Sequence, residues 1–180
     1  MSALNDFLDE ERALIVSVPV RVGYWISHVD DLKATARDDT KEQLAIERAM
    51  KLIISRTADT RFINDVAEYA LAGKAEWAGW RDRADTVLDD LPRALRLIKD
   101  RLPVKDLKDY QSAIYRVAGV VAQAASENGG EDDLSREVMG AGLVARLLDR
   151  LSVKTDMSVP ENISDAEKAA LQKLLACLKG

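Results

Sequence analysis

Cysteine and histidine, which many enzymes use for metal and redox chemistry, are almost absent from the sequence. Cys177 is the only cysteine and His28 the only histidine among the 180 residues. One chain therefore cannot form an intramolecular disulfide, or a zinc site of the common Cys/His type. A glycine-rich phosphate loop, a Gly-x-Ser-x-Gly elbow and a His-Glu-x-x-His motif are also missing from the sequence. These absences favour a binding protein over an enzyme.

The sequence also lacks an excess of basic charge and long apolar runs. The formal net charge is −5, whereas nonspecific nucleic-acid binding needs basic side chains that displace counterions from phosphates. Uncharged stretches such as 13–20 and 117–125 are far shorter than the roughly 18 apolar residues of a membrane-spanning helix. The acidic start MSALNDFLDEER is unlike a secretion signal, which begins with basic residues. We therefore expect a cytoplasmic protein with no nucleic-acid partner and no integral membrane segment.

Aromatic residues make up only 5% of the chain, although 47% of it is hydrophobic. The core must therefore consist mainly of Ala, Leu, Val and Ile, which favours closely packed helices. A domain of this length buries roughly 70% of the surface that its unfolded chain exposes. No linker or low-complexity tract divides the sequence, so we predict a single domain over residues 1–180.

The segment around Pro19 is consistent with two kinds of secondary structure. Apolar residues follow steps of four and three, as on one face of a helix, at Leu14, Val18, Val22, Trp25 and Val29. The run VSVPVRV nevertheless alternates and is rich in β-branched residues, which is typical of a strand. The local pattern alone favours the strand.

An internal repeat favours the helix instead. When the sequence is shifted by one hundred positions, the segment from Ala13 aligns with the segment from Ala113, and residues 113–125 are Ala-rich and helical in character. Each copy leads to a second helix that opens with a capping box, formed by Thr40 and Gln43 or by Ser164 and Glu167. We expect an additional helix in the second copy, near 133–151, before its capping box. We therefore predict a duplicated helical hairpin.

The region between the two copies also shows helical periodicity. One stripe consists of Phe62, Ile63, Val66, Ala67 and Ala70, and a second of Trp77, Trp80, Ala84, Val87 and Leu88. Pro92 is compatible with the first turn of a further helix that ends at Pro103. The whole pattern predicts an all-α fold, a single compact bundle of seven or eight helices.

The second copy resembles the tellurite-resistance TerB-like family. In that family's motif a helix ends in Ala-Asp-Gly, and Ile-Ser then precedes a Glu that opens another helix. Residues 113–130 and 163–178 carry the match, with Asn128-Gly129, Ile163-Ser164 and Glu167 in the motif positions. This chain departs from the motif because Asn128 replaces the aspartate and about 32 residues separate the two halves. The resemblance implies an all-helical stress-response protein, in places credited with binding divalent cations through acidic residues.

Acidic residues around Gly129 and Gly130 are candidate metal ligands. An EF-hand loop is excluded because a glycine at its sixth position places Ala124 or Ala125 at the first, where an oxygen ligand is required. A looser site for Ca²⁺ or Mg²⁺ remains possible, with the ligands Glu127, Glu131, Asp132 and Glu167. The alternative is that these carboxylates cap helices and keep a turn hydrated.

Four other residues have both a functional and a structural interpretation. Trp77 and Trp80 are candidate residues for an apolar pocket or an exposed partner site, although such a pair is more often part of the core. His28 in isolation is a plausible general base, and a helix-end histidine is the alternative. Cys177 lies between Lys173 and Lys179, which favour a reactive thiolate, while a small buried apolar residue is the alternative.

These observations favour a non-enzymatic scaffold or stress-associated interaction protein that acts through a protein partner or self-association. The sequence predicts no cofactor beyond the possible Ca²⁺ or Mg²⁺. A divalent-cation-binding domain is the second hypothesis, and a lipid- or metabolite-binding helical bundle is the third.

Overall fold

The computed structural model describes residues 2–29, 39–55, 60–126 and 164–179. Within these residues the chain is an all-α bundle of seven α-helices with three short 3₁₀ helices and no strand, as the sequence predicts. In chain order the elements are η1 (Ala3–Asp6), α1 (Asp9–His28), α2 (Asp39–Ile54), α3 (Arg61–Ala72), η3 (Lys74–Glu76), α4 (Trp77–Arg81), η4 (Ala84–Thr86), α5 (Val87–Arg101), α6 (Val104–Ser126) and α8 (Asp165–Lys179).

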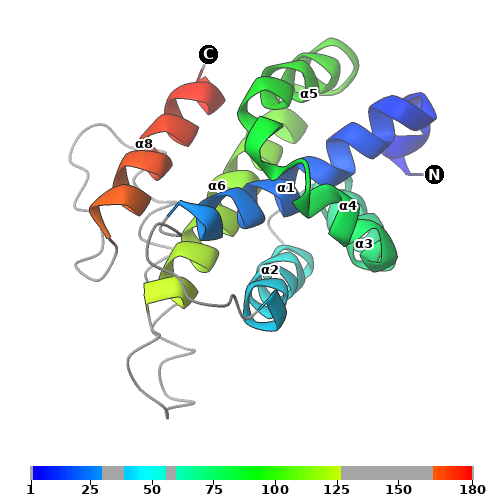
Figure 1. Cartoon of the computed structure of the whole chain (residues 1–180). Coiled ribbons are helices and arrows are strands. Elements are labelled where there is room, and N and C mark those ends of the chain that lie inside the picture. The colour runs from blue at the N-terminus through cyan, green and yellow to red at the C-terminus, as the bar shows by residue number, and fades with distance from the viewer. Residues whose placement is uncertain (1, 30–38, 56–59, 127–163, 180) are drawn as a thin grey trace.

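Helix α1 is the central element of the bundle. It packs against α6 along its length and also contacts α5, α4, α3 and α2, and it crosses the middle of the molecule between α5 and α2 (Figure 1). Every residue from Ile15 to Tyr24 is buried. The prediction of a helix is therefore confirmed, but a single apolar stripe is too narrow a description. The strand-like alternation of this segment reflects burial on all sides of a helix.

Pro19 lies inside α1 and leaves a backbone acceptor without its usual donor. A proline has no amide hydrogen, so the carbonyl of Ile15, four residues earlier, receives no helical hydrogen bond from position 19. The hydroxyl of Tyr110, from α6, donates a hydrogen bond of 2.8 Å to this carbonyl. Tyr110 is fully buried, and loss of hydration raises the pKa of its phenol. The neutral hydroxyl therefore replaces the missing amide inside the core.

Three consecutive residues near the start of α6 connect it to three other helices. The carboxylate of Asp109 accepts a hydrogen bond of 2.8 Å from the amide of Thr60, which precedes α3. Tyr110 donates to α1, as described above. The side-chain amide of Gln111 donates to the carbonyl of Leu178 in the last turn of α8. Because helix ends lack internal partners for their backbone groups, the contacts of Asp109 and Gln111 stabilise the ends of α3 and α8.

The two helix pairs expected from the internal repeat are α1 with α2 and α6 with α8. In the second pair the capping box forms as predicted, since Ser164 Oγ accepts from the amide of Glu167 at 3.1 Å and Glu167 Oε2 accepts from the amide of Ser164 at 3.0 Å. In the first pair the prediction is wrong. Helix α2 begins at Asp39, so Thr40 lies within the helix and not at its cap. The helix expected near 133–151 lies outside the described residues.

The second stripe of the central region does not belong to one continuous helix. Trp77 and Trp80 lie on the short helix α4, and Ala84 begins the separate element η4. The predicted start of the next helix at Pro92 is also wrong, because α5 begins at Val87 and contains Pro92 in its interior. The first stripe, on α3, is confirmed, since all five of its apolar residues are buried.

Candidate functional site

Only one of the four candidate metal ligands lies within the described residues. Glu167 is buried, and it closes the capping box of α8 with Ser164. Glu127, Glu131 and Asp132 fall outside the described residues. Among the residues that are described, no group of three or more His, Cys, Asp or Glu side chains is placed to hold a metal ion. The cation site remains a prediction, which requires millimolar Ca²⁺ or Mg²⁺ to raise the melting temperature.

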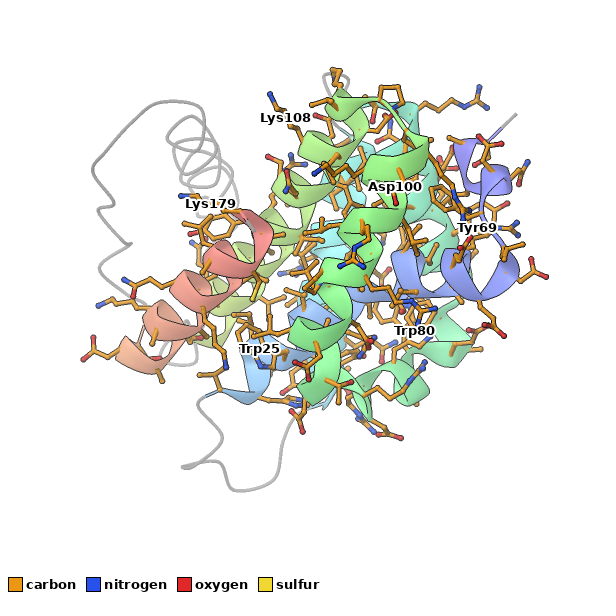
Figure 2. All side chains as sticks on the ribbon, turned by 90° about the horizontal axis from the view of Figure 1, so that it is seen from above. Trp25, Tyr69, Trp80, Asp100, Lys108 and Lys179 are labelled. Carbon is orange, nitrogen blue, oxygen red and sulfur yellow. The ribbon has the colours of Figure 1, made fainter. Side chains whose placement is uncertain are left out.

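The two tryptophans of α4 lie in the core. Trp77 and Trp80 are both buried, and Figure 2 shows Trp80 among the helices, whereas Lys108 and Lys179 point away from the bundle. The indole NH of Trp77 donates a hydrogen bond of 2.8 Å to the carbonyl of Ala70, in the last turn of α3. This agrees with the core interpretation of the pair. An exposed partner site at these two residues does not fit their burial.

His28 and Cys177 have surroundings that agree with their structural interpretations. His28 is the last residue of α1, and its Nε2 atom lies 3.9 Å from Oε2 of Glu42 on α2. A histidine at the carbonyl end of a helix is favourably placed when it is protonated. Cys177 is half-buried and packs against the core. His28 lies at the end of α1 and Cys177 near the end of α8.

Arg21 is a buried charge that the sequence patterns did not identify. Its guanidinium, on α1, donates to the carbonyl of Arg83 at 2.7 and 3.1 Å, to Thr86 Oγ1 at 2.8 Å and to Asp90 Oδ2 at 2.7 Å. These partners belong to η4, to the turn before it and to α5. A buried cation is tolerated only when it is paired and hydrogen-bonded. Arg21 therefore fixes α5 against α1, which is a structural role.

The surface of α2 carries apolar residues that the core does not use. The side of α2 that faces the core buries Ala45, Ile46, Ala49, Met50 and Ile53. On the opposite side Leu44 is 48% exposed and Leu52 is 39% exposed. Both leucines lie outside the set of positions that α2 buries. Their spacing relative to those positions is the signal in the sequence that could have identified them.

Basic side chains accompany the two leucines. Arg48 and Lys51 are exposed, and the positions 44, 48, 51 and 52 follow the spacing i, i+4, i+7, i+8 that defines one helix face. We call these four residues, Leu44, Arg48, Lys51 and Leu52, the α2 face. Two acidic residues of the same helix, Glu42 and Glu47, are both more than four-fifths buried. The charged residues of the α2 face are therefore all basic, in a chain whose net charge is negative.

Glu47, next to the α2 face, is the centre of an ion-pair network. Glu47 contacts the ammonium groups of Lys51, at 2.7 Å, and of Lys74. Hydrogen bonds from Lys51, and then from Lys74, lower the pKa of Glu47 from 4.5 to about 2. Lys74 also lies 6.0 Å from the centre of the Trp77 ring. The network connects α2 to η3 and α4. These contacts hold in place the helix that carries the α2 face.

Neither a membrane-spanning helix among the described residues nor a matching known protein was found. Within the described residues, none of the helices combines the length and apolar content that would let it cross a membrane. No protein-family model matches the chain, and no curated protein and no solved structure matches it either.

Proposed function

We propose that the protein is a non-enzymatic, cytoplasmic, helical scaffold or stress-associated interaction protein of TerB-like architecture. It binds a protein partner, and the α2 face is the binding surface. The single observation that carries this proposal is the exposure of Leu44 and Leu52 beside Arg48 and Lys51, on a helix that already buries its other side.

The chemistry of the α2 face supports a protein partner. Fully covering one leucine stabilises a complex by about 1.5–3 kcal/mol, and these two are already half covered. Arginine is among the residues enriched at protein interfaces. The basic groups add attraction to an acidic partner, and this attraction weakens with salt. The result is a reversible interaction whose specificity depends on both the apolar and the basic groups.

A crosslinking experiment tests the proposal at the level of single positions. A photoreactive phenylalanine analogue replaces Leu52 on the α2 face or, as the control, the exposed Ala176 on α8. We expect a crosslinked protein product in cells from position 52 that is lost when Arg48→Glu is added, and no such product from position 176. Equal crosslinking from both positions, or none from position 52, would overturn the proposal.

A further inference from the structure

We infer that the α2 face binds a second copy of this chain, at an acidic apolar patch around Leu8. This inference rests on the proposed function of the α2 face and identifies its partner. We define the N-terminal patch as Asp6, Leu8, Asp9 and Glu10, all of which are exposed. The patch combines an apolar centre with carboxylates, which is the complement of leucines flanked by basic residues.

Leu8 is placed where neither capping nor core packing accounts for it. It is the N-cap residue of α1 and is 70% exposed, the highest value among the large apolar residues described. The preferred N-cap residues are Ser, Thr, Asp and Asn, whose side chains accept a hydrogen bond from the first turn. Glu11 does accept a hydrogen bond of 2.9 Å from the amide of Leu8, but a leucine side chain cannot return one. Natural proteins break such local rules mainly at functional or strained sites.

The backbone on both sides of Leu8 is held in place by contacts within the chain itself. The neighbouring Phe7 is buried, and Arg101 lies over its ring at 5.2 Å. Arg101 also forms two hydrogen bonds to the carboxylate of Glu11 and one, of 3.1 Å, to the carbonyl of Asp6. Arg12 donates to the carbonyls of Leu4 and Phe7. Because the backbone is already ordered, binding at Leu8 loses little conformational entropy.

The two surfaces are separate on one molecule and complementary between two. The N-terminal end of α1 and the helix α2 lie on different sides of the bundle (Figure 1). A chain therefore cannot cover its own α2 face with its own N-terminal patch. Contact between unlike surfaces of two copies is heterologous, and unless the assembly closes into a ring it leaves one free surface of each kind at its ends. Association should then continue beyond the dimer as the concentration rises.

Leu8 favours a second copy over an anionic membrane. The net charge of −5 produces a general repulsion both from an anionic lipid surface and from a second copy. The N-terminal patch of a second copy offers an exposed leucine beside its carboxylates, which complements the leucines and basic groups of the α2 face. The few apolar side chains involved place the contact among small, transient interfaces. We expect weak self-association that decreases at high salt, because exposed charges are screened.

Sedimentation velocity over micromolar to millimolar concentrations measures this association in the full chain. Leu8→Ser removes the apolar centre of one surface and completes a capping box with Glu11, so this variant should melt at a higher temperature than the wild-type chain. Leu44→Gln with Leu52→Gln alters only exposed side chains on the other surface. Lys173→Glu, on the exposed side of α8, changes charge as much as Arg48→Glu does and serves as its control. We expect only Lys173→Glu to associate like the wild-type chain.

Mixing two defective variants provides the decisive test. Leu8→Ser keeps an intact α2 face, and the double leucine variant keeps an intact N-terminal patch. Each alone should stay monomeric, whereas their mixture should form a dimer and nothing larger. A wild-type chain that is monomeric at all concentrations, or a mixture that stays monomeric, overturns the inference. Capture of another protein at position 52 by a monomeric chain would overturn the inference while preserving the proposed function. Vesicle binding that is lost with Arg48→Glu would overturn both.

Discussion

Arg21 and Asp90 form an ion pair whose two members differ greatly in burial. The side chain of Arg21 is 2% exposed and that of Asp90 is 37% exposed. Water can therefore hydrate Asp90 when Arg21 is removed, whereas removal of Asp90 takes the charged partner away from an arginine that is buried. The carbonyl of Arg83 would also keep a hydrogen bond of 3.1 Å from Thr86 without Arg21. Loss of the aspartate should consequently cost more than loss of the arginine.

Chemical denaturation of three variants tests this asymmetry. We predict a cost of about 3–5 kcal/mol for Asp90→Ala, which leaves a buried charge unpaired. Arg21→Met keeps most of the side-chain volume and should cost about 1–3 kcal/mol. The double variant should be more stable than Asp90→Ala alone. Equal costs for the two single variants, or strictly additive costs in the double variant, would contradict a buried ion pair.

The burial or exposure of single residues is the feature of this structure that is hardest to predict from the sequence. The helical spacing of apolar residues identifies the stripe of α3 correctly, because all of it is buried. It does not identify Arg21 as buried or Leu44 as exposed, since both depend on which helices lie opposite. The burial of an arginine needs acceptors from η4 and α5, and those come from residues more than sixty positions away.

Among the elements, α1 depends on a hydrogen bond supplied by another helix. Tyr110→Phe removes the hydroxyl that bonds to the carbonyl of Ile15. The buried carbonyl is then unsatisfied, which should cost about 1–3 kcal/mol. In a Pro19→Ala background the amide of residue 19 is available to the same carbonyl. We therefore predict a smaller cost of Tyr110→Phe in that background.

Urea denaturation of the wild-type chain, the two single variants and the double variant measures this coupling. The coupling energy is the difference between the cost of Tyr110→Phe in the wild-type background and its cost in the Pro19→Ala background. An equal cost in both backgrounds would show that the hydroxyl does not replace the proline's missing amide.

The close approach of α1 and α2 provides a second prediction for the elements. A Cβ atom added at Gly23 would lie 2.6 Å from Cγ1 and 3.0 Å from Cδ1 of Ile46, whereas one added at Gly119 of α6 has no neighbour within 4 Å. Gly23→Ala should destabilise the chain by about 1–3 kcal/mol, because overpacking exceeds the gain in helix propensity. Gly119→Ala should stabilise it by about 0.5–1 kcal/mol. Thermal melts that shift in the same direction for both variants would refute this packing.

The elements were more predictable than the residues, for a physical reason. The helical period of α1 competes with a strand-like composition, and the internal repeat resolves the choice correctly. The same reasoning fails at the boundaries, where α2 begins at Asp39 and α5 begins at Val87. Helix starts depend on local capping and on packing of the first turn, which apolar spacing does not encode.

The stability of the whole molecule depends on pH through two ion-paired carboxylates, those of Glu47 and Glu11. Hydrogen bonds from Lys51 and Lys74 lower the pKa of Glu47 from 4.5 to about 2, and a hydrogen bond from Arg101 lowers the pKa of Glu11. A carboxylate whose pKa is lowered by folding stabilises the folded state above its unfolded pKa, and this contribution disappears as pH falls through the folded pKa. The relevant window for Glu47 runs from pH 4.5 to about 2.

Melting temperatures of the wild-type chain and of Glu11→Gln with Glu47→Gln test this dependence. The variant should melt lower at neutral pH, and the two curves should converge as the pH falls through that window. A difference that stays constant down to about pH 2 would mean that these ion pairs do not contribute.

The all-α fold could be predicted for the whole molecule, but the candidate surface could not. An aliphatic composition and a helical spacing of apolar residues identify a helical bundle, because the core of such a bundle is built from residues of that kind at that spacing. The α2 face and the N-terminal patch are defined by apolar residues that the core leaves exposed, and only the packed structure separates these from core residues. The cation site around Glu127 remains a prediction, as does the TerB-like resemblance.

We propose that the α2 face and the N-terminal patch are binding surfaces. Backbone amide NMR spectra of the wild-type chain, recorded over a dilution series at low salt, test both surfaces in one measurement. We expect concentration-dependent shifts at residues 44–52 and 5–10 that decrease at high salt, and unchanged amides around Lys173 and Ala176 on α8. Spectra that do not change with concentration, or shifts confined to other helices, would contradict this proposal.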